Sequence, residues 1–180
     1  MSELVIRLES ERVLLREWQE DDLEPWVALN LDSENLRYFP RTYSDEESRA
    51  SFTRISDSLK ESKYGLWAAE EKSSKEFMGF IGLAKAELPG VSFMPCHEIG
   101  WRLDKRYWGK GYATEAAKVA LAYGLTELNI PTIYSFTSIQ NFPSIGVMKK
   151  IGLRERPELS FEHPRIEIGN PVRSHVVYST

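Results

Sequence analysis

The stretch that decides the fold is residues 96–128, which read CHEIGWRLDKRYWGKGYATEAAKVALAYGLTEL. Its first eight residues predict a strand, because side chains alternate between two faces along a strand, and here one face carries Glu98 and Arg102. Residues 112–128 place small side chains at helical spacing, which suits close packing of a helix on a sheet. A short turn joins the two segments. The sequence therefore predicts a strand-turn-helix unit at the centre of the fold.

Two glycines, Gly109 and Gly111, stand in this turn. Because glycine has no Cβ, the chain can bend sharply there, and the backbone N–H groups from Gly109 to Ala113 can point together at an anion. Arg106 and Lys110 add positive charge. This arrangement suits a pyrophosphate, although a tight turn into a helix with no ligand is the alternative interpretation.

Two nucleotide-binding motifs fit the turn poorly. A dinucleotide-binding turn needs G-x-G-x-x-G, but Thr114 stands where the third glycine belongs. The P-loop pattern G-x-x-x-x-G-K-[ST] does not occur in the sequence. Both nucleotide hypotheses are therefore weak.

The remaining apolar spacing predicts further strands and helices in a compact order. The strands are expected at 12–16, 64–70, 77–87, 132–139 and 175–178. The helices are expected after the caps Asp21 and Asp22, after a capping box of Ser44 and Glu47, and after Asn141. The resulting order, β-α-α-β-β-β-α-β-α-β-β, predicts an α/β or α+β fold with helices on both faces of a sheet.

Composition limits the classes of protein. With 180 residues, of which 42% are hydrophobic, we expect a single domain over residues 1–180. No run approaches the roughly 18 apolar residues of a membrane span, and the first residues do not resemble a signal peptide. The single cysteine, Cys96, fits a reducing compartment. We therefore expect a cytoplasmic protein without a membrane partner.

The charge pattern argues against nucleic acid as a partner. The formal net charge is -4, and no basic run resembles a footprint for a phosphate backbone. His163 and His175 lack the spacing of metal ligands, so we expect no metal site.

The motif Arg106-x-x-Gly109-x-Gly111 matches the [QR]-x-x-G-x-[GA] acetyl-CoA motif of GNAT acetyltransferases, with a strand before it and a helix after it. Nearly the whole chain resembles the RimJ/RimL branch of that family, on the segments 13–16, 98–101, 141–144 and 150–153. The resemblance implies a mixed, mostly antiparallel central sheet flanked by helices on both faces. It also implies acetyl-CoA as the acetyl donor and CoA as the product.

The resemblance implies a set of acetyl-CoA-binding residues. The backbone of residues 101–103 resembles the splayed strand that pairs with the pantetheine arm, and Asn141 and Ser144 face CoA in the family. Helix capping is the alternative role for Asn141. The complete expected set is Trp101, Arg102, Leu103, Arg106, Gly109, Lys110, Gly111, Tyr112, Ala113, Asn141 and Ser144.

Transfer from a thioester to an amine needs a neutral amine, a polarised carbonyl and a route for release of the thiolate. By resemblance, Glu98 is the expected base, and the alternative is a charge pair with Arg102. The family often places a tyrosine, as the acid, where this sequence has Met148. Ser144 can supply a hydroxyl, and we name Glu98 and Ser144 as the catalytic candidates.

Three functions stay open on the sequence. The branch acetylates protein N-termini, and an α-amine near pKa 7.8 asks less of a base than a lysine near 10.4. Close relatives modify polyamines, antibiotics or other small amines. A non-catalytic acyl-CoA sensor is the third hypothesis, which Met148 supports. We expect an N-terminal α-amine of a peptide or protein as the acceptor, and a monomer or homodimer.

Overall fold

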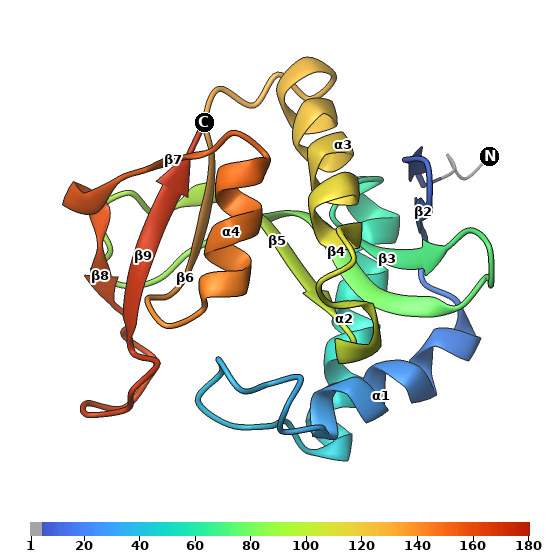
Figure 1. Cartoon of the computed structure of the whole chain (residues 1–180), viewed down its shortest axis with the longest axis horizontal. Coiled ribbons are helices and arrows are strands. Elements are labelled where there is room, and N and C mark those ends of the chain that lie inside the picture. The colour runs from blue at the N-terminus through green and yellow to red at the C-terminus, as the bar shows by residue number, and fades with distance from the viewer. Residues whose placement is uncertain (1–4) are drawn as a thin grey trace.

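The computed structural model describes residues 5–180 and contains one nine-stranded sheet. The strand order is β1-β2-β3-β4-β5-β6-β9-β7, and β8 pairs with β9 (Figure 1). Its strands are β1 (Leu8–Glu9), β2 (Val13–Arg16), β3 (Leu66–Glu71), β4 (Phe77–Ala86), β5 (Cys96–Leu103), β6 (Ile133–Ser138), β7 (Arg154–Glu155), β8 (Phe161–Glu162) and β9 (Ser174–Ser179).

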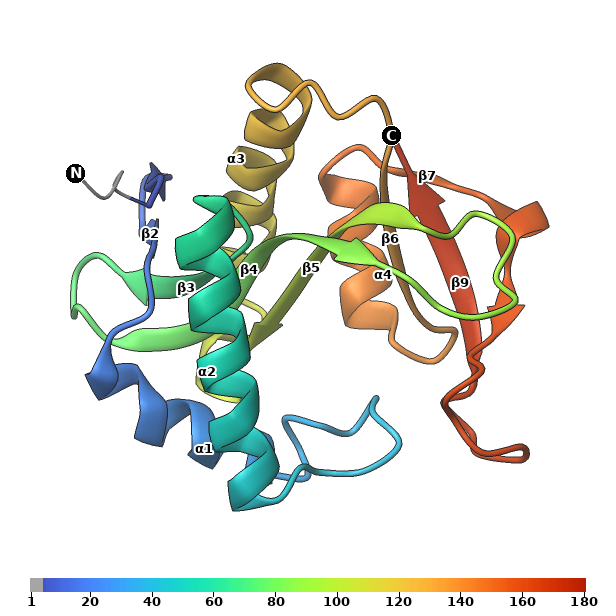
Figure 2. The ribbon, with the colours of Figure 1, turned by 180° about the vertical axis from the view of Figure 1, so that it is seen from behind.

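The sheet is mostly antiparallel, and its one parallel pair in the described chain is β5 with β6. The helices are α1 (Leu23–Leu31), α2 (Asp45–Ser62), α3 (Tyr112–Thr126) and α4 (Phe142–Lys150). Helices α1 and α2 cover one face of the sheet, whereas α3 and α4 cover the other (Figures 1 and 2). The predicted fold class, a mixed and mostly antiparallel sheet flanked by helices on both faces, is confirmed.

The predicted start of α2 is confirmed in detail. Ser44 Oγ accepts a hydrogen bond from the Glu47 backbone N–H at 3.1 Å, and Glu47 Oε2 accepts one from the Ser44 N–H at 2.8 Å. This capping box satisfies two amide groups that have no partner inside the helix. Arg41 also pairs with Glu47 at 2.7 Å and, as the largest cause, lowers the pKa of that carboxyl to about 2.

Asp22 does not cap α1 with its side chain as the sequence predicts. Its carboxylate instead binds the buried Arg16 guanidinium through two hydrogen bonds, of 2.7 and 2.9 Å, and accepts a third from the Gln19 N–H. Arg16 also binds Glu70 on β3. A buried cation needs such partners, so this cluster outcompetes the cap and ties the start of α1 to the sheet.

Helix α3 lies close to the sheet because its inner face is made of small residues. Ala116, Ala117 and Ala120 are fully buried. A Cβ added at Gly124 would lie 2.7 Å from Ile133 Cδ1 and 2.9 Å from Leu83 Cδ1. The predicted smooth face of this helix is therefore the contact that sets its height above β4 and β6.

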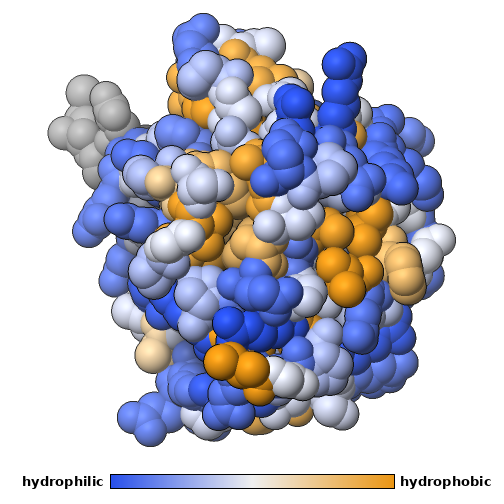
Figure 3. All heavy atoms as spheres, turned by 90° about the vertical axis from the view of Figure 1, so that its left-hand side faces the viewer, coloured by the Kyte–Doolittle hydropathy of each residue, from blue (hydrophilic) through white to orange (hydrophobic). Residues whose placement is uncertain are grey.

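The β8–β9 end of the sheet carries the exposed apolar side chains of its loops. Its surface shows separate hydrophobic patches among hydrophilic side chains (Figure 3). Phe142 is 73% exposed and Ile168 is 90% exposed. Trp18 is buried against Trp26, Phe52 and Phe77. Across the described residues, none of the helices is both long enough and apolar enough to span a membrane.

Candidate active site

The glycine turn leaves β5 and enters α3 through a short 3-10 segment. Asp104 Oδ1 accepts a hydrogen bond from the Arg106 N–H at 2.9 Å and so caps that segment. Gly109 and Gly111 then take φ values of 71° and 86°, in the left-handed region that favours glycine. A Cβ added at Gly109 would meet nothing within 4 Å. The turn therefore presents open space beside backbone, as an approaching ligand requires.

The first turn of α3 offers N–H groups to that space. Gly111 precedes the helix and supplies no side-chain cap. The N–H groups of the first helical residues have no partner inside a helix, and the helix dipole makes this end partly positive. Tyr112, Ala113 and Thr114 line the adjacent cleft. These groups fit an anion such as the pyrophosphate of CoA.

Arg12, the residue just before β2, fixes the turn from outside. Its guanidinium binds Glu115 of α3 at 2.7 and 2.8 Å and donates to the Lys110 carbonyl oxygen at 3.1 Å. It also lies over the Tyr112 ring, 4.4 Å from the centroid. The Tyr112 hydroxyl binds Glu71, which raises the pKa of that tyrosine. The turn is thus held in place by residues distant in sequence.

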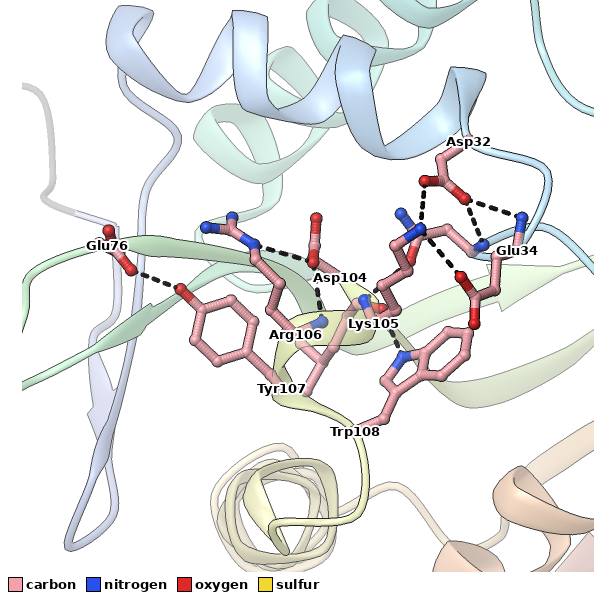
Figure 4. Close-up of polar contacts among 10 residues, drawn as sticks. Asp32, Glu34, Glu76, Asp104, Lys105, Arg106, Tyr107 and Trp108 are labelled. Carbon is pink, nitrogen blue, oxygen red and sulfur yellow. Dashed lines mark hydrogen bonds and ion pairs between the residues drawn. The ribbon is translucent and has the colours of Figure 1, made fainter.

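The charged residues around the turn are largely paired with each other (Figure 4). Lys105 lies between Asp32 and Glu34, at 2.7 and 2.9 Å, and these hydrogen bonds raise the pKa of Lys105. Arg106 binds Asp104 at 3.0 Å. The side chains of Arg106 and Lys110 do not line the cleft, so the contribution of either charge to cofactor binding stays a prediction.

The parallel strands β5 and β6 separate shortly after they meet. Their recorded pairs are His97 with Ile133 and Glu98 with Tyr134, and no later residue of β5 pairs with β6. The backbone edge of 99–103 therefore faces a cleft of about 970 Å³. An extended ligand can pair with such an edge, which fits the pantetheine arm of acetyl-CoA.

Helix α4 closes the far side of the cleft. Ser144 Oγ accepts a hydrogen bond from Trp101 Nε1 at 3.2 Å. Asn141 Oδ1 accepts one from the Ser144 N–H at 3.3 Å, so Asn141 does cap α4 while it lines the cleft. Of the predicted cofactor residues, Trp101, Arg102, Leu103, Gly109, Gly111, Tyr112, Ala113, Asn141 and Ser144 all line this cleft.

Glu98 lies in the same cleft with no ion pair to Arg102. Arg102 instead donates to Asn30 Oδ1 at 2.7 Å, so the charge-pair alternative is not what the structure contains. Burial raises the pKa of Glu98 to about 8. A carboxyl with that pKa is ionised in part near neutral pH, and its ionised form binds a proton tightly enough to act as a general base.

Several residues of the cleft were not predicted from the sequence as site residues. Phe136, His163 and His175 line the cleft, and the two histidine rings lie 5.1 Å apart. Burial is the main cause that lowers the pKa of His163 to about 4 and also lowers that of His175, so both are neutral at pH 7. They come from β9 and the segment after β8, which meet only in the folded sheet.

Two further residues take the roles expected for buried apolar side chains. Met148 is 1% exposed and packs into the core from α4, at the position where the family often has a tyrosine. Burial raises the pKa of the Cys96 thiol to about 12, so the thiolate that a nucleophile needs does not form near neutral pH.

Comparisons with known proteins agree with this geometry. The family described as "Acetyltransferase (GNAT) domain" matches residues 12–154. The Bacillus subtilis (strain 168) protein named uncharacterized N-acetyltransferase YnaD is 30% identical over 149 residues, which are 83% of either chain. The spermidine N(1)-acetyltransferase of Escherichia coli (strain K12) is 28% identical over 156 residues, 83% of this chain and 77% of the relative.

A solved structure shares the same architecture. The acetyltransferase (GNAT family) from Bacillus anthracis superimposes with a TM-score of 0.79 and 27% sequence identity, over 97% of this chain and 98% of the other. The glycine turn, the splayed strands and the buried glutamate thus occur in a chain that matches the family over most of its length. This chain belongs to the GNAT family of N-acetyltransferases, which use acetyl-CoA as the acetyl donor.

Proposed function

We propose that this enzyme acetylates the N-terminal α-amine of a peptide or protein, as a member of the RimJ/RimL-like branch, with Glu98 as the base. The observation that carries the proposal is the half-buried Glu98 in the cleft, whose carboxyl has a pKa near 8 because it is desolvated. An α-ammonium group has a pKa near 7.8, close to that value, whereas a lysine side chain lies near 10.4. Proton transfer between the α-amine and Glu98 is therefore nearly balanced.

The charge of the cleft supports an α-amine over a polyamine. Among the described lining residues, Glu98 is the one carboxylate, whereas Arg37, Arg102, Lys150 and Arg165 are cationic. A polyamine carries several positive charges and needs several acidic partners. Like charges placed together repel, so this lining disfavours the substrate named for the Escherichia coli relative.

The chemistry divides among a few groups of this chain. Acetyl-CoA, when bound, supplies an acetyl group activated as a thioester. Glu98 takes the proton from the acceptor ammonium, and the freed nitrogen lone pair forms the C–N bond to the acetyl carbon. Backbone N–H groups of the unpaired β5 edge polarise the carbonyl oxygen. As the C–S bond breaks, the Ser144 hydroxyl stands ready to donate a proton to the sulfur.

Two features keep these groups in position. Ser144 is held by its hydrogen bonds to Trp101 and to the Asn141 cap, so its hydroxyl stays on the cleft wall. Glu98 lies beside Gly100, where an added Cβ would be 3.9 Å from Glu98 Oε1. The missing side chain at Gly100 leaves room for the acceptor next to the base.

The test is CoA release with four acceptors at equal concentration: the peptide Ala-Ala-Ala-amide, its N-acetylated form, spermidine, and N-acetyl-lysine-amide. The proposal expects release with the free α-amine alone, and mass spectrometry should place the acetyl group on that amine. Release with spermidine or the lysine side chain, and none with the peptide, would overturn the proposed acceptor class.

A further inference from the structure

Arg102 is a half-buried cation whose Nε atom is fully buried, and it has no anionic partner in the part of the chain that the structure describes. No carboxylate forms an ion pair with it, and its Nε has no hydrogen-bond partner. Its hydrogen bonds go to two uncharged groups, the Asn30 amide oxygen and the Tyr43 side chain. An arginine stays charged in proteins, and a buried charge is normally paired. The buried Nε donor is therefore free to bind an anionic group.

Aromatic rings hold the guanidinium in a fixed position. Its Cζ atom lies 4.3 Å from the centroid of Phe39 and 5.4 Å from those of Trp26 and Tyr43. Phe80, its partner on β4, lies 5.7 Å away. Ring faces attract a cation but provide no carboxylate for its N–H groups, and among these four residues Tyr43 alone adds a hydrogen bond. The rings thus orient the guanidinium of Arg102, while most of its five N–H donors have no hydrogen-bond partner in the described chain.

Arg102 stands where two cavities meet. It lines the large cleft that contains Glu98, and it lines a second cavity of about 620 Å³ below α2. The second cavity is also lined by the cationic side chains of Arg54 and Lys85, and no acidic residue of the described chain lines it. Both sides of Arg102 therefore favour a negative group.

The position of Arg102 on β5 relates it to the acceptor. It shares a strand face with Glu98 and Gly100, since side chains alternate along a strand. Arg102 lies four positions after Glu98, roughly 13 Å along the strand. Gly100, between them, has no side chain to obstruct a ligand. An acceptor lying over Gly100 can therefore contact Glu98 and Arg102 at the same time.

We propose that Arg102 recognises a carboxylate on the acceptor, several bonds away from the amine that is acetylated. A carboxylate matches the guanidinium fork and gives a charge-assisted, bidentate pair. Two acceptors supply that chemistry: a peptide whose first residue is acidic, and a short peptide that ends in a free carboxylate near its N-terminus. This inference rests on the proposed α-amine acceptor.

The experiment compares kcat/KM within two matched pairs of acceptors. Asp-Ala-Ala-amide against Asn-Ala-Ala-amide tests a side-chain carboxylate, and Ala-Ala against Ala-Ala-amide tests a terminal one. We expect the acid to be favoured about tenfold or more in at least one pair, and Arg102→Met to remove that preference. Dividing the wild-type ratio by the variant ratio cancels differences between the acceptor amines themselves.

Two other variants control for folding and for general charge loss. Lys60→Met removes an exposed cation of α2 that lines neither cavity, and it should keep the preference. Asn30→Asp puts a carboxylate where the amide oxygen now lies 2.7 Å from Arg102. It should pair the cation internally and remove the preference without loss of thermal stability, even where Arg102→Met fails to fold.

A binding measurement separates this inference from the proposed reaction. Calorimetry with CoA present compares N-acetyl-Asp-Ala-Ala-amide with its Asn analogue, and N-acetyl-Ala-Ala with its amide. If the wild type binds the acid more tightly than its analogue and Asn30→Asp abolishes that difference, the role of Arg102 is supported. This holds even if no peptide is acetylated, a result that would overturn the proposed acceptor class alone. Equal binding and equal kcat/KM within both pairs, or a preference that survives in Asn30→Asp, would overturn the role of Arg102.

Discussion

The indole Nε1 of Trp101 donates a hydrogen bond to the Ser144 hydroxyl oxygen, 3.2 Å away, and so links strand β5 to helix α4 across the cleft. The bond uses a lone pair of the hydroxyl and leaves its O–H free to donate. Trp101 thus fixes Ser144 at the cleft wall, as the proposed proton donation to the leaving thiolate requires.

We predict that Ser144→Ala lowers kcat by about tenfold near pH 7, with KM for acetyl-CoA changed by less than about twofold. A thiol with a pKa near 8.5 leaves unaided once the pH exceeds that value, so the defect should shrink at higher pH. Trp101→Phe, which keeps the ring but removes the donor, should have a smaller effect. A full wild-type kcat in Ser144→Ala at neutral pH would leave Ser144 as a structural acceptor only.

Gly109→Val should weaken acetyl-CoA binding by at least about tenfold, because a branched side chain would fill the open space beside the turn. The control is Gly90→Val. Gly90 has a φ of 75°, also has nothing within 4 Å of an added Cβ, and does not line the cleft. Both variants carry similar backbone strain, so calorimetry isolates the ligand effect. Equal affinity in the two variants would remove the turn from the cofactor site.

Gly124→Ala should destabilise the fold by about 1–3 kcal/mol, because its Cβ would lie 2.7 Å from Ile133 Cδ1. The ends of the Ile133 and Leu83 side chains can rotate, so we expect the lower part of that range. Gly146→Ala in α4 has nothing within 4 Å of the added Cβ and should be neutral or stabilising. Urea unfolding of both variants gives the comparison. Equal stability would contradict the close packing of α3.

Burial of Glu98 has a consequence for stability as well as for activity. Its pKa is about 8 in the fold and 4.5 as the ordinary value, so the folded state binds the proton more tightly. Stability from this group is present below pH 4.5 and is lost as the pH rises toward 8. Glu98→Gln cannot ionise and should lose less thermal stability between pH 5 and pH 9 than the wild type. An equal change in melting temperature between pH 5 and pH 9 in the two proteins would show that the Glu98 carboxyl is not desolvated.

Local features of this fold could be predicted from the sequence. The turn at Gly109 and Gly111 and the capping box of Ser44 and Glu47 depend on neighbouring residues, so their spacing is visible in the chain. Strand β1 was missed, and the predicted order places one strand without bounds where β7 and β8 lie. These strands of two residues each depend on pairing with a neighbouring strand rather than on apolar periodicity.

The environment of the site depends on long-range packing and was not visible in the sequence. Arg102 was expected to contribute its backbone, yet its side chain lies among rings from α1, β4 and the loop before α2. Similarly, His163 and His175 have no spacing that predicts a site, yet the pairing of β8 with β9 brings both to the wall of the cleft. Asp22 was expected to cap a helix from its position in the sequence. Its pairing with Arg16 forms only in the buried cluster and could not be predicted from local spacing.

The most direct test of the account is kcat/KM against pH for Ala-Ala-Ala-amide, in the wild type and in Glu98→Gln. In the wild type, the rate should rise with pH and level off above about 8, since Glu98 accepts a proton only when ionised. Glu98→Gln should be about 100-fold slower on that plateau, with unchanged acetyl-CoA affinity. A wild-type rate and pH profile in the variant would contradict Glu98 as the base and, with it, the proposed mechanism.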